Sequence, residues 1–275
     1  MGIATLLMIV LTAGELRWRS LTKELWQRLS SGREKTPAGN FSVSELQGLP
    51  PPVQKYLQLA LAPGQPLISA VAIHTEGTFN TGEIQDSWYP FSARQLAVMN
   101  ERGFVWDGSV KLVPGVRMLV HDAYVTGEGI LRPSVAGLVD ITHLQGSGEI
   151  ARGELMRFLA ESPWYPSALL PREGVTWTPI DEHSALATLR DHAASVSLTF
   201  RFSDDGMIAS IRAEDRSRAV GGKMVPTPWE GRWWDYRAES GMQVPGRGEV
   251  AWILDTGAKP YWRGRVTTMR YEFAR

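Results

Sequence analysis

Residues 196–213 read VSLTFRFSDDGMIASIRA, the clearest strand signal in the chain. Apolar side chains alternate with polar ones in VSLTFRF, and a second run, MIASIRA, follows the Asp-Asp-Gly at 204–206. Alternation with a period of two is typical of strands, and a short turn containing glycine joins two strands into an antiparallel hairpin. The stretch therefore predicts a hairpin whose two strands are neighbours in sequence.

The same pattern recurs on both sides of this hairpin. It begins near Leu67 and continues towards the C-terminus, interrupted once by a helical segment. Strands are predicted at 67–79, through Trp88, and at 93–99, 103–107, 117–125, 127–132, 174–180, 184–190, 195–203, 207–214, 229–237, 248–254 and 264–273. About a dozen strands joined mostly by short turns predict a mainly β fold of the α+β type, an antiparallel sheet curled into a barrel or half-barrel.

The composition fits a globular chain and excludes several classes of site. Of the 275 residues, 43% are apolar and 21% charged, and 27 Gly and 17 Pro accompany 11 Trp, which favours short strands and turns. Lys+Arg and Asp+Glu number 29 each and the body has no basic stripe, so the sequence predicts no nucleic-acid partner. Cysteine is absent, which excludes disulfides, thiolate chemistry and cysteine-ligated metals.

Residues 1–29 form a separate N-terminal segment. Residues 1–14, MGIATLLMIVLTAG, are apolar and uncharged but shorter than the ~20 residues of a full membrane span. A helical stripe of Trp18, Leu21, Leu25 and Leu29 follows, with basic residues largely around its other side. This pattern is typical of a membrane anchor, a transmembrane or interfacial helix, with an amphipathic continuation. We expect attachment to a bacterial inner membrane, with the side of the globular domain left open; a helix docked on the domain is the alternative.

The globular domain is predicted to span 42–275 as one β-rich unit with a leading helix. Residues 30–41, SSGREKTPAGNF, are polar and are interpreted as a linker. Ser42 and Glu45 then have the spacing of a capping box, and Pro51 suits a helix start. The apolar stripe from 53 to 61 has helical spacing, so this helix is predicted to pack on the sheet.

The helical interruption of the strands reads IARGELMRFLAESPWYPSALLP, residues 150–171. One helix inside a series of strands is expected to pack across the sheet and help to close its core. Arg157 and Glu161 stand one turn apart, the spacing of an ordinary ion pair on a solvated helix face. The functional alternative puts them at the rim of a cavity, where they bind a polar headgroup while Trp164 and Tyr165 hold an apolar tail.

Residues 227–237, TPWEGRWWDYR, are predicted as a strand with aromatic side chains on both faces. One face carries Arg232, Trp234 and Tyr236, and it is a candidate wall for the same cavity. The alternative is that the aromatic side chains fill a core or pair across strands. The predicted ligand-binding residues are thus Arg157, Glu161, Trp164, Tyr165, Arg232, Trp234 and Tyr236.

No catalytic constellation is recognisable, so the catalytic residues stay unknown. The five histidines, at 74, 121, 143, 183 and 192, lack a compact metal-ligand spacing. His121 and Asp122 with Asp140 and His143 would form a mononuclear site only if their strands are neighbours, and ordinary polar positions are the simpler interpretation. The sequence predicts no cofactor and no metal site.

Several phrases occur in order along the chain: PPPVQKYLQLAL, FVWDG, RFLAESPWYPSALLP, TPWEGRWWDYR, VPGRGEVAWIL and PYWRG. In them the chain, over residues 15–273, resembles an uncharacterised bacterial family of membrane-anchored proteins known only as a domain of unknown function. The resemblance implies one β-rich domain behind an N-terminal anchor, and no known activity. More distantly, the predicted sheet resembles the half-barrels of bacterial lipoprotein carriers, which hold acyl chains in an apolar cavity, a likeness of fold alone.

Three functions remain open. The first is a membrane-anchored protein that binds a lipid or another apolar small molecule without chemistry. The second is a structural or interaction module with a filled core. The third is an enzyme for a lipid-like substrate, with Glu161, His121 or Asp122 as acid–base groups. A cavity of several hundred Å³ lined by Trp and Leu would favour the first or third function over the second.

Overall fold

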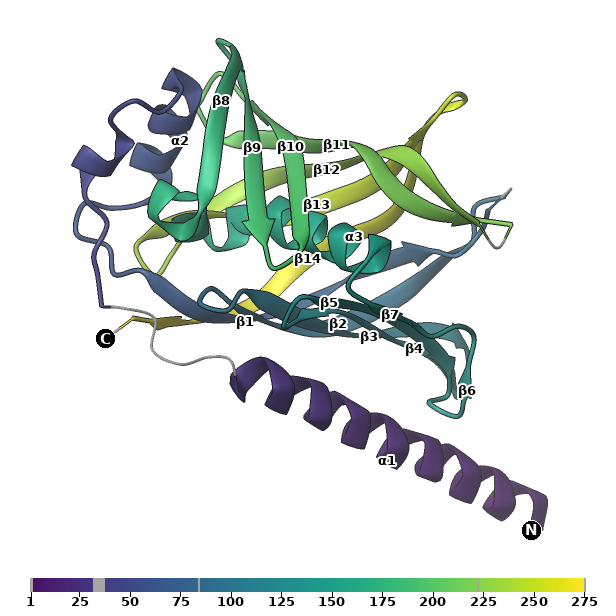
Figure 1. Ribbon diagram of the computed structural model, residues 1–275. Coiled ribbons are helices and arrows are strands. Elements are labelled where there is room, and N and C mark those ends of the chain that lie inside the picture. Colours follow the sequence, from purple (N-terminus) through teal and green to yellow (C-terminus); the bar gives the residue numbers. More distant parts are fainter. Residues whose placement is uncertain (1, 32–37, 84, 222, 275) are drawn as a thin grey trace.

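The computed structural model describes residues 2–31, 38–83, 85–221 and 223–274, and these form one large curled sheet with helices packed against it (Figure 1). The strands are β1 (Ile68–Asn80), β2 (Trp88–Val98), β3 (Gly103–Val113), β4 (Val116–Val125), β5 (Glu128–Val135), β6 (Val139–Asp140), β7 (Leu144–Gly146), β8 (Val175–Asp181), β9 (Ser184–Asp191), β10 (Ala194–Phe202), β11 (Ile208–Val220), β12 (Lys223–Glu239), β13 (Met242–Leu254) and β14 (Gly257–Phe273). The fold is mainly β, as predicted.

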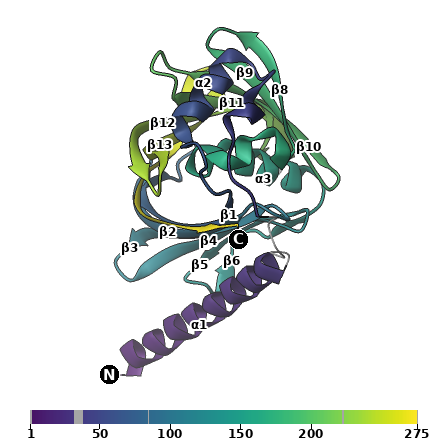
Figure 2. The ribbon, with the colours of Figure 1, turned by 90° about the vertical axis from the view of Figure 1, so that its left-hand side faces the viewer.

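The order of the strands is β6-β5-β4-β3-β2-β1-β14-β13-β12-β11-β10-β9-β8, and β7 pairs with β5. Every neighbouring pair is antiparallel. Strands next to each other in the sheet follow each other in the chain, except where β1 pairs with β14 and β5 pairs with β7. Since β6 and β8 end the order, the sheet curls without closing (Figure 2). The predicted half-barrel is confirmed.

The hairpin read from residues 196–213 is present as β10 and β11. The Ser203 backbone N–H donates to Met207 O at 2.9 Å across the turn. Gly206 has a φ of 89°, a left-handed conformation that glycine adopts without strain. Several strands run further than predicted: β12 and β14 each contain 17 residues. The added residues of β12 and β14 include Pro226, Pro228 and Pro260, and a proline in the sequence argues against a continuous strand.

The helical interruption is α3 (Glu149–Ala160), which lies inside the curl of the sheet (Figure 2). Leu155 and Leu159 on this helix are fully buried in the main core. Three short 3-10 turns follow at Ser162–Trp164, Pro166–Leu169 and Pro171–Glu173, and each has a proline in its first turn. The predicted helix that packs across the sheet is therefore correct.

The helix predicted before the sheet is α2 (Pro51–Ala60), and it covers one end of the half-barrel (Figure 1). Its apolar stripe, Val53, Tyr56, Leu57, Ala60 and Leu61, is buried throughout. The capping box also forms, because Ser42 and Glu45 cap a short 3-10 helix at Val43–Leu46.

The N-terminal segment is a single helix, α1 (Gly2–Ser31), which lies against the outer, convex face of the sheet (Figure 2). Leu25 and Leu29 are buried there in a second apolar cluster with Val98, Val105 and Ala123. Of the amphipathic stripe that suggested a membrane interface, Trp18, Leu25 and Leu29 are therefore buried against protein and Leu21 is half-buried, as in the docked-helix alternative.

Polar contacts fix the register of α1 on the sheet. Arg17 forms an ion pair with Asp140 at 3.1 Å and donates to Gly137 O at 2.6 Å, and Arg28 pairs with Glu128 at 3.0 Å. A Cβ at Gly14 would lie 2.2 Å from Ala136 O, so the turn between β5 and β6 crosses the helix where only glycine leaves room.

The first turns of α1 extend past the sheet (Figure 1). Their apolar side chains are exposed: Leu6 by 62%, Met8 by 69% and Ile9 by 60%. Within the described residues, no helix combines the length and the apolar character needed to cross a bilayer. Half of the predicted linker, residues 32–37, lies outside the described residues.

Candidate functional site

A cavity lies between α3 and the concave face of the sheet. Its volume is about 510 Å³, within the range of small-molecule sites. α3 contributes Gly153 and Ala160 to the lining, and side chains of β3, β4, β5 and β11–β14 supply most of the rest. Ile141 and Met224 also line it and are exposed, so apolar side chains extend from the interior to the surface of the protein.

Tryptophan dominates the wall. Six of the eleven tryptophans of the chain line the cavity. The Trp164 ring meets Trp233 edge-on at 4.8 Å and Trp262 at 6.4 Å, and its Nε1–H donates to Pro245 O at 3.1 Å. These contacts fix the rings, so the wall is rigid as well as apolar. The six are Trp106, Trp164, Trp229, Trp233, Trp252 and Trp262.

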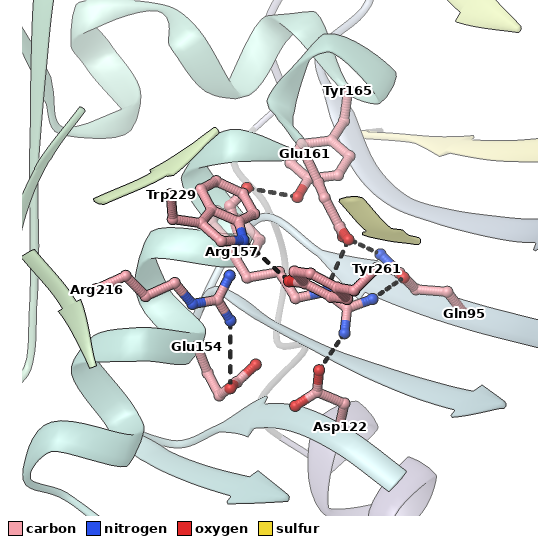
Figure 3. A network of polar contacts seen from close by, with 10 residues as sticks. Gln95, Asp122, Glu154, Arg157, Glu161, Tyr165, Arg216, Trp229 and Tyr261 are labelled. Atoms are coloured by element: carbon pink, nitrogen blue, oxygen red, sulfur yellow. Dashed lines mark hydrogen bonds and ion pairs between the residues drawn. The ribbon is translucent and has the colours of Figure 1, made fainter. Parts of the chain in front are cut away.

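Arg157 forms the centre of a polar network in this cavity (Figure 3). Its Nε–H donates to Glu161 Oε1 at 2.8 Å, an Nη1–H donates to Asp122 Oδ2, and an Nη2–H reaches Gln95 Oε1 at 3.4 Å. Gln95 in turn donates to Glu161 Oε2 at 2.6 Å. The guanidinium carbon also lies 4.9 Å from the centre of the Phe104 ring. The donors of Arg157 are therefore engaged in hydrogen bonds that join α3 to β2 and β4.

The charge of Arg157 is held in place by its neighbours. Burial alone would lower the pKa of this guanidinium, but the carboxylates of Glu161, Asp122 and Glu154 raise the pKa above its ordinary value. Because its donors are paired and one face of its guanidinium is covered, Arg157 has a structural role in the site and is not free to contact a ligand.

Glu154 and Arg216 form the second half of the network (Figure 3). Arg216 Nη2 lies 3.8 Å from Glu154 Oε1, and its guanidinium carbon lies 4.8 Å from the centre of the Trp229 ring. Burial raises the pKa of Glu154 well above its ordinary value, and the carboxylate of Asp122 raises it further, while Arg216 and Arg157 act in the opposite direction. The oxygens Glu154 Oε2 and Asp122 Oδ1 are buried without a partner.

The side chains of the suggested histidine-containing metal site do not come together in this cavity. His121 points to the convex face, where its Nε2 lies 2.7 Å from Thr22 Oγ1 of α1, and Asp122 points to the cavity, as strand alternation predicts. Asp140 is paired with Arg17 and Arg132. Among the described residues, no three His, Cys, Asp or Glu side chains are arranged to hold a metal ion, so the suggested site at His121, Asp122, Asp140 and His143 is wrong.

The structure brings together only part of the predicted ligand-binding set. Arg157, Glu161 and Trp164 line the cavity. Tyr165 is buried behind them, where its hydroxyl donates to Phe158 O at 2.6 Å. Its pKa is raised by that burial.

The other three predicted residues lie elsewhere. Arg232 and Trp234 point outwards from β12: Trp234 is 43% exposed, and Arg232 pairs with Glu230 at 2.7 Å. Tyr236 packs against the core and donates to Ile208 O at 2.9 Å. The candidate wall is therefore on the other face of this strand, which carries Trp229 and Trp233.

Several residues of the site were missed by sequence reasoning, above all Glu154 and Arg216. Glu154, Arg157 and Glu161 are spaced at i, i+3 and i+7, so they form a charged stripe on an otherwise apolar helix. This stripe is the sequence signal that could have identified Glu154. Arg216 carries no such signal. It follows a β-bulge between Ala213 and Arg216, which shifts the side that each later residue faces.

Comparison with known proteins gives distant structural likenesses. A putative outer membrane lipoprotein-sorting protein domain from Vibrio parahaemolyticus is similar, with 10% identity and a TM-score of 0.40 over 74% of this chain and 86% of that chain. A LolA superfamily protein from Nitrosomonas europaea has 11% identity and a TM-score of 0.39 over 80% and 92%. A DUF1329 family protein from Desulfovibrio piger has 9% identity and a TM-score of 0.40 over 74% and 86%.

None of the curated proteins matches the sequence. A family described as of unknown function, DUF6920, matches residues 47–271, which include α2, α3 and nearly all of the sheet. The family resemblance and the distant likeness to lipoprotein-carrier domains expected from the sequence are both found. The chain belongs to the DUF6920 family.

Proposed function

We propose that the protein binds one lipid or other apolar small molecule in the cavity between α3 and the sheet, without transforming it. The observation that carries this proposal is the cavity itself, about 510 Å³ with six tryptophans in its wall. A module with a filled core, the main alternative, would leave no such space, since protein interiors pack with few voids larger than a water molecule.

An enzymatic role has less support from the contacts. Of the three acid–base groups suggested by the sequence, His121 lies on the other face of the sheet, beneath α1. Asp122 and Glu161 both face the cavity, but each forms an ion pair with Arg157, so an oxygen of each carboxylate is already engaged within the protein.

The test of binding uses Gly153, which lies in α3 and lines the cavity. A Cβ added there meets no other atom within 4 Å, so a larger side chain has room without displacing its neighbours. Gly153→Phe should fill part of the cavity, while Gly153→Ala makes the same change of backbone freedom with little added volume. Both should stabilise α3 slightly, because glycine costs about 1 kcal/mol in a helix interior.

The measurement is mass spectrometry of organic extracts from the full chain, purified from a bacterial host without detergent. We expect an apolar molecule near one per protein in the wild type and in Gly153→Ala, and its loss in Gly153→Phe with no loss of thermal stability. A wild-type protein that carries nothing and takes up no added long-chain alcohol would contradict the proposal.

We also propose that the first turns of α1 attach the protein to a membrane, with the bacterial inner membrane as the prediction from the family resemblance. Residues 2–14 contain no charge, and their exposed Leu6, Met8 and Ile9 are followed by Arg17 and Arg19. Apolar side chains next to basic ones are the composition of segments that lie in a bilayer interface.

Flotation of the full chain with phospholipid vesicles tests this attachment. Ile9→Asp should abolish flotation, because an aspartate inserts poorly into an apolar phase. The matched control is Val113→Asp, which changes an exposed apolar side chain of β3 (59% exposed) and should float like the wild type. Equal flotation of the two variants, or none by the wild type, would exclude a role for these turns.

A further inference from the structure

Arg216 of β11 has hydrogen-bonding capacity that the protein does not use. Arg216 is only 8% exposed, and it lines the cavity. Its one ion-pair contact, with Glu154, is 3.8 Å long, beyond hydrogen-bond range. Within the described part of the chain its side chain makes no hydrogen bond, although a guanidinium group carries five donors. A cation enclosed in this way ordinarily has full hydrogen-bond partners.

The donors of Arg216 are open to the cavity. One face of the guanidinium is covered by Trp229, whose Nε1–H donates in turn to the Tyr261 hydroxyl at 2.9 Å. The side chain of Arg216 lines the cavity and keeps 10% of its surface accessible. Arg157 differs, because Glu161, Asp122 and Gln95 occupy its donors. Of the two arginines, Arg216 is the one able to contact a ligand.

The acidic side chains of the site do not offer an equivalent contact. Asp122 Oδ2 and both oxygens of Glu161 are engaged by Arg157 and Gln95. The two oxygens without a partner, Asp122 Oδ1 and Glu154 Oε2, are completely enclosed, so a ligand cannot reach them without rearrangement. A single proton on Glu154 would instead let these two oxygens share a hydrogen bond. The remaining oxygen of Glu154, Oε1, faces Arg216 at 3.8 Å, so the group with unused hydrogen-bond donors at this point of the cavity is the guanidinium of Arg216.

We propose, on the basis of the binding function above, that the ligand is an amphiphile whose head is a carboxylate or a similar anionic acceptor, held by Arg216, with its apolar chain against the tryptophan wall. An anion gives the unused N–H groups of Arg216 charge-assisted partners in an enclosed site, where such hydrogen bonds are strongest. Trp229 holds the guanidinium by its face and leaves the edge, which carries the donors, free to turn to the ligand.

This arrangement couples binding to a proton on Glu154. The charged and titratable groups around that carboxyl are Asp122 on β4, Arg157 on α3 and Arg216 on β11. Ionised Glu154 competes with the ligand for Arg216, whereas protonated Glu154 binds Asp122 and releases Arg216. Burial and Asp122 already raise the Glu154 pKa. The affinity for a carboxylate should therefore fall as the pH rises through that pKa, and Glu154→Gln should remove this dependence.

The experiment measures calorimetric binding of dodecanoate, dodecanol and dodecylamine to the delipidated full chain at pH 7, below their micelle concentrations. We expect dodecanoate to bind most tightly. Arg216→Gln should weaken the affinity for dodecanoate by about tenfold to a hundredfold, the range for a hydrogen bond to a charged group. The same variant should change the affinity for dodecanol by less than about twofold. The control is Arg212→Gln on the same strand, which removes an arginine paired with Glu214 outside the cavity.

The outcomes separate this inference from the binding function. If dodecanol binds as tightly as dodecanoate, if dodecylamine binds best, or if Arg216→Gln weakens all three alike, the anionic head is excluded although the cavity still binds apolar chains. If none of the three binds to the wild type, the binding function itself fails. The comparison of the three head groups in the wild type needs no variant. It therefore tests the preference for an anionic head even if Arg216→Gln does not fold.

Discussion

Trp18 of α1 stacks on His121 of β4, with the ring centres 3.8 Å apart and the planes within 11° of parallel. The same indole donates to Asp107 Oδ1 at 2.9 Å, and the imidazole contacts Thr22 one turn further along the helix. The helix is thus fastened to the sheet through a titratable ring that is fully buried. Burial lowers the pKa of His121 to about 4, in spite of the nearby carboxylate of Asp107.

Stability should therefore fall when His121 is forced to accept a proton. The pKa is lower in the folded protein than the ordinary 6.5, so the unfolded chain binds more protons between these values. The stabilisation is complete above pH 6.5 and is lost as the pH falls towards 4. We expect the free energy of unfolding in urea to drop by about 2 kcal/mol from pH 7 to pH 5 from this residue.

The drop at acidic pH should be absent in His121→Gln, which cannot titrate, and retained in His74→Gln, which changes an exposed histidine of β1. A wild type and a His121→Gln variant with parallel pH profiles would show that the buried imidazole does not control the docking of α1.

Glu154 should have the opposite pH dependence. Its folded pKa is raised, so its stabilisation is present below the ordinary value of 4.5 and is lost as the pH rises through the folded pKa. Glu154→Gln should gain stability over the wild type between pH 5 and pH 8, by about 1.4 kcal/mol for each unit by which folding raises the pKa. Urea unfolding at the two pH values measures this, with the exposed Glu214→Gln as control; a constant difference would contradict it.

The two faces of β12 should differ strongly in their effect on stability. Trp233→Ala removes an indole that is 6% exposed and packs against Trp164, and it should cost about 3–5 kcal/mol of unfolding free energy. Trp234→Ala removes one that is 43% exposed and should cost less than about 1 kcal/mol. Equal losses in urea unfolding would mean that the inner and outer faces of the strand are assigned incorrectly.

If the cavity holds an alkyl chain, affinity should grow with chain length. Each added methylene contributes up to about 0.8 kcal/mol, or about fourfold in the dissociation constant. Calorimetry with octanol, decanol and dodecanol tests this independently of any head group. The increase should stop once the chain exceeds the cavity, and Gly153→Phe should make it stop at a shorter chain. Affinity that does not change with chain length would argue against a tail-binding wall.

Much of the fold follows from local patterns in the sequence, and the site follows from them only in part. The stripe of α2 and the hairpin at 204–206 depend on neighbours in sequence, which is why both are predicted correctly. On β12 the alternation separates Trp229 and Trp233 from Arg232 and Trp234, but both faces carry aromatic side chains. Which of them meets the cavity depends on the curl of the whole sheet, a property that no single strand encodes.

Arg216 shows a second limit. Ile211 and Ala213 are buried, so a regular strand would turn residue 215 inwards and Arg216 outwards. The bulge after Ala213 inserts one extra residue and reverses this order. A bulge leaves little trace in composition, whereas the spacing of Arg157 and Glu161 on a helix is regular, and that pair was found.

The pairing of β1 with β14 has a consequence for how the chain folds. Apart from the pairing of β5 with β7, the other neighbouring strands of the sheet are also neighbours in sequence, so β1–β5 and β8–β14 are two meanders that local contacts can build on their own. The seam between them joins distant residues: Thr267 donates to His74 O across 193 positions of the chain. Because closing so long a loop is slow, the seam should set the folding rate, and variants in it should slow refolding more than variants within either meander.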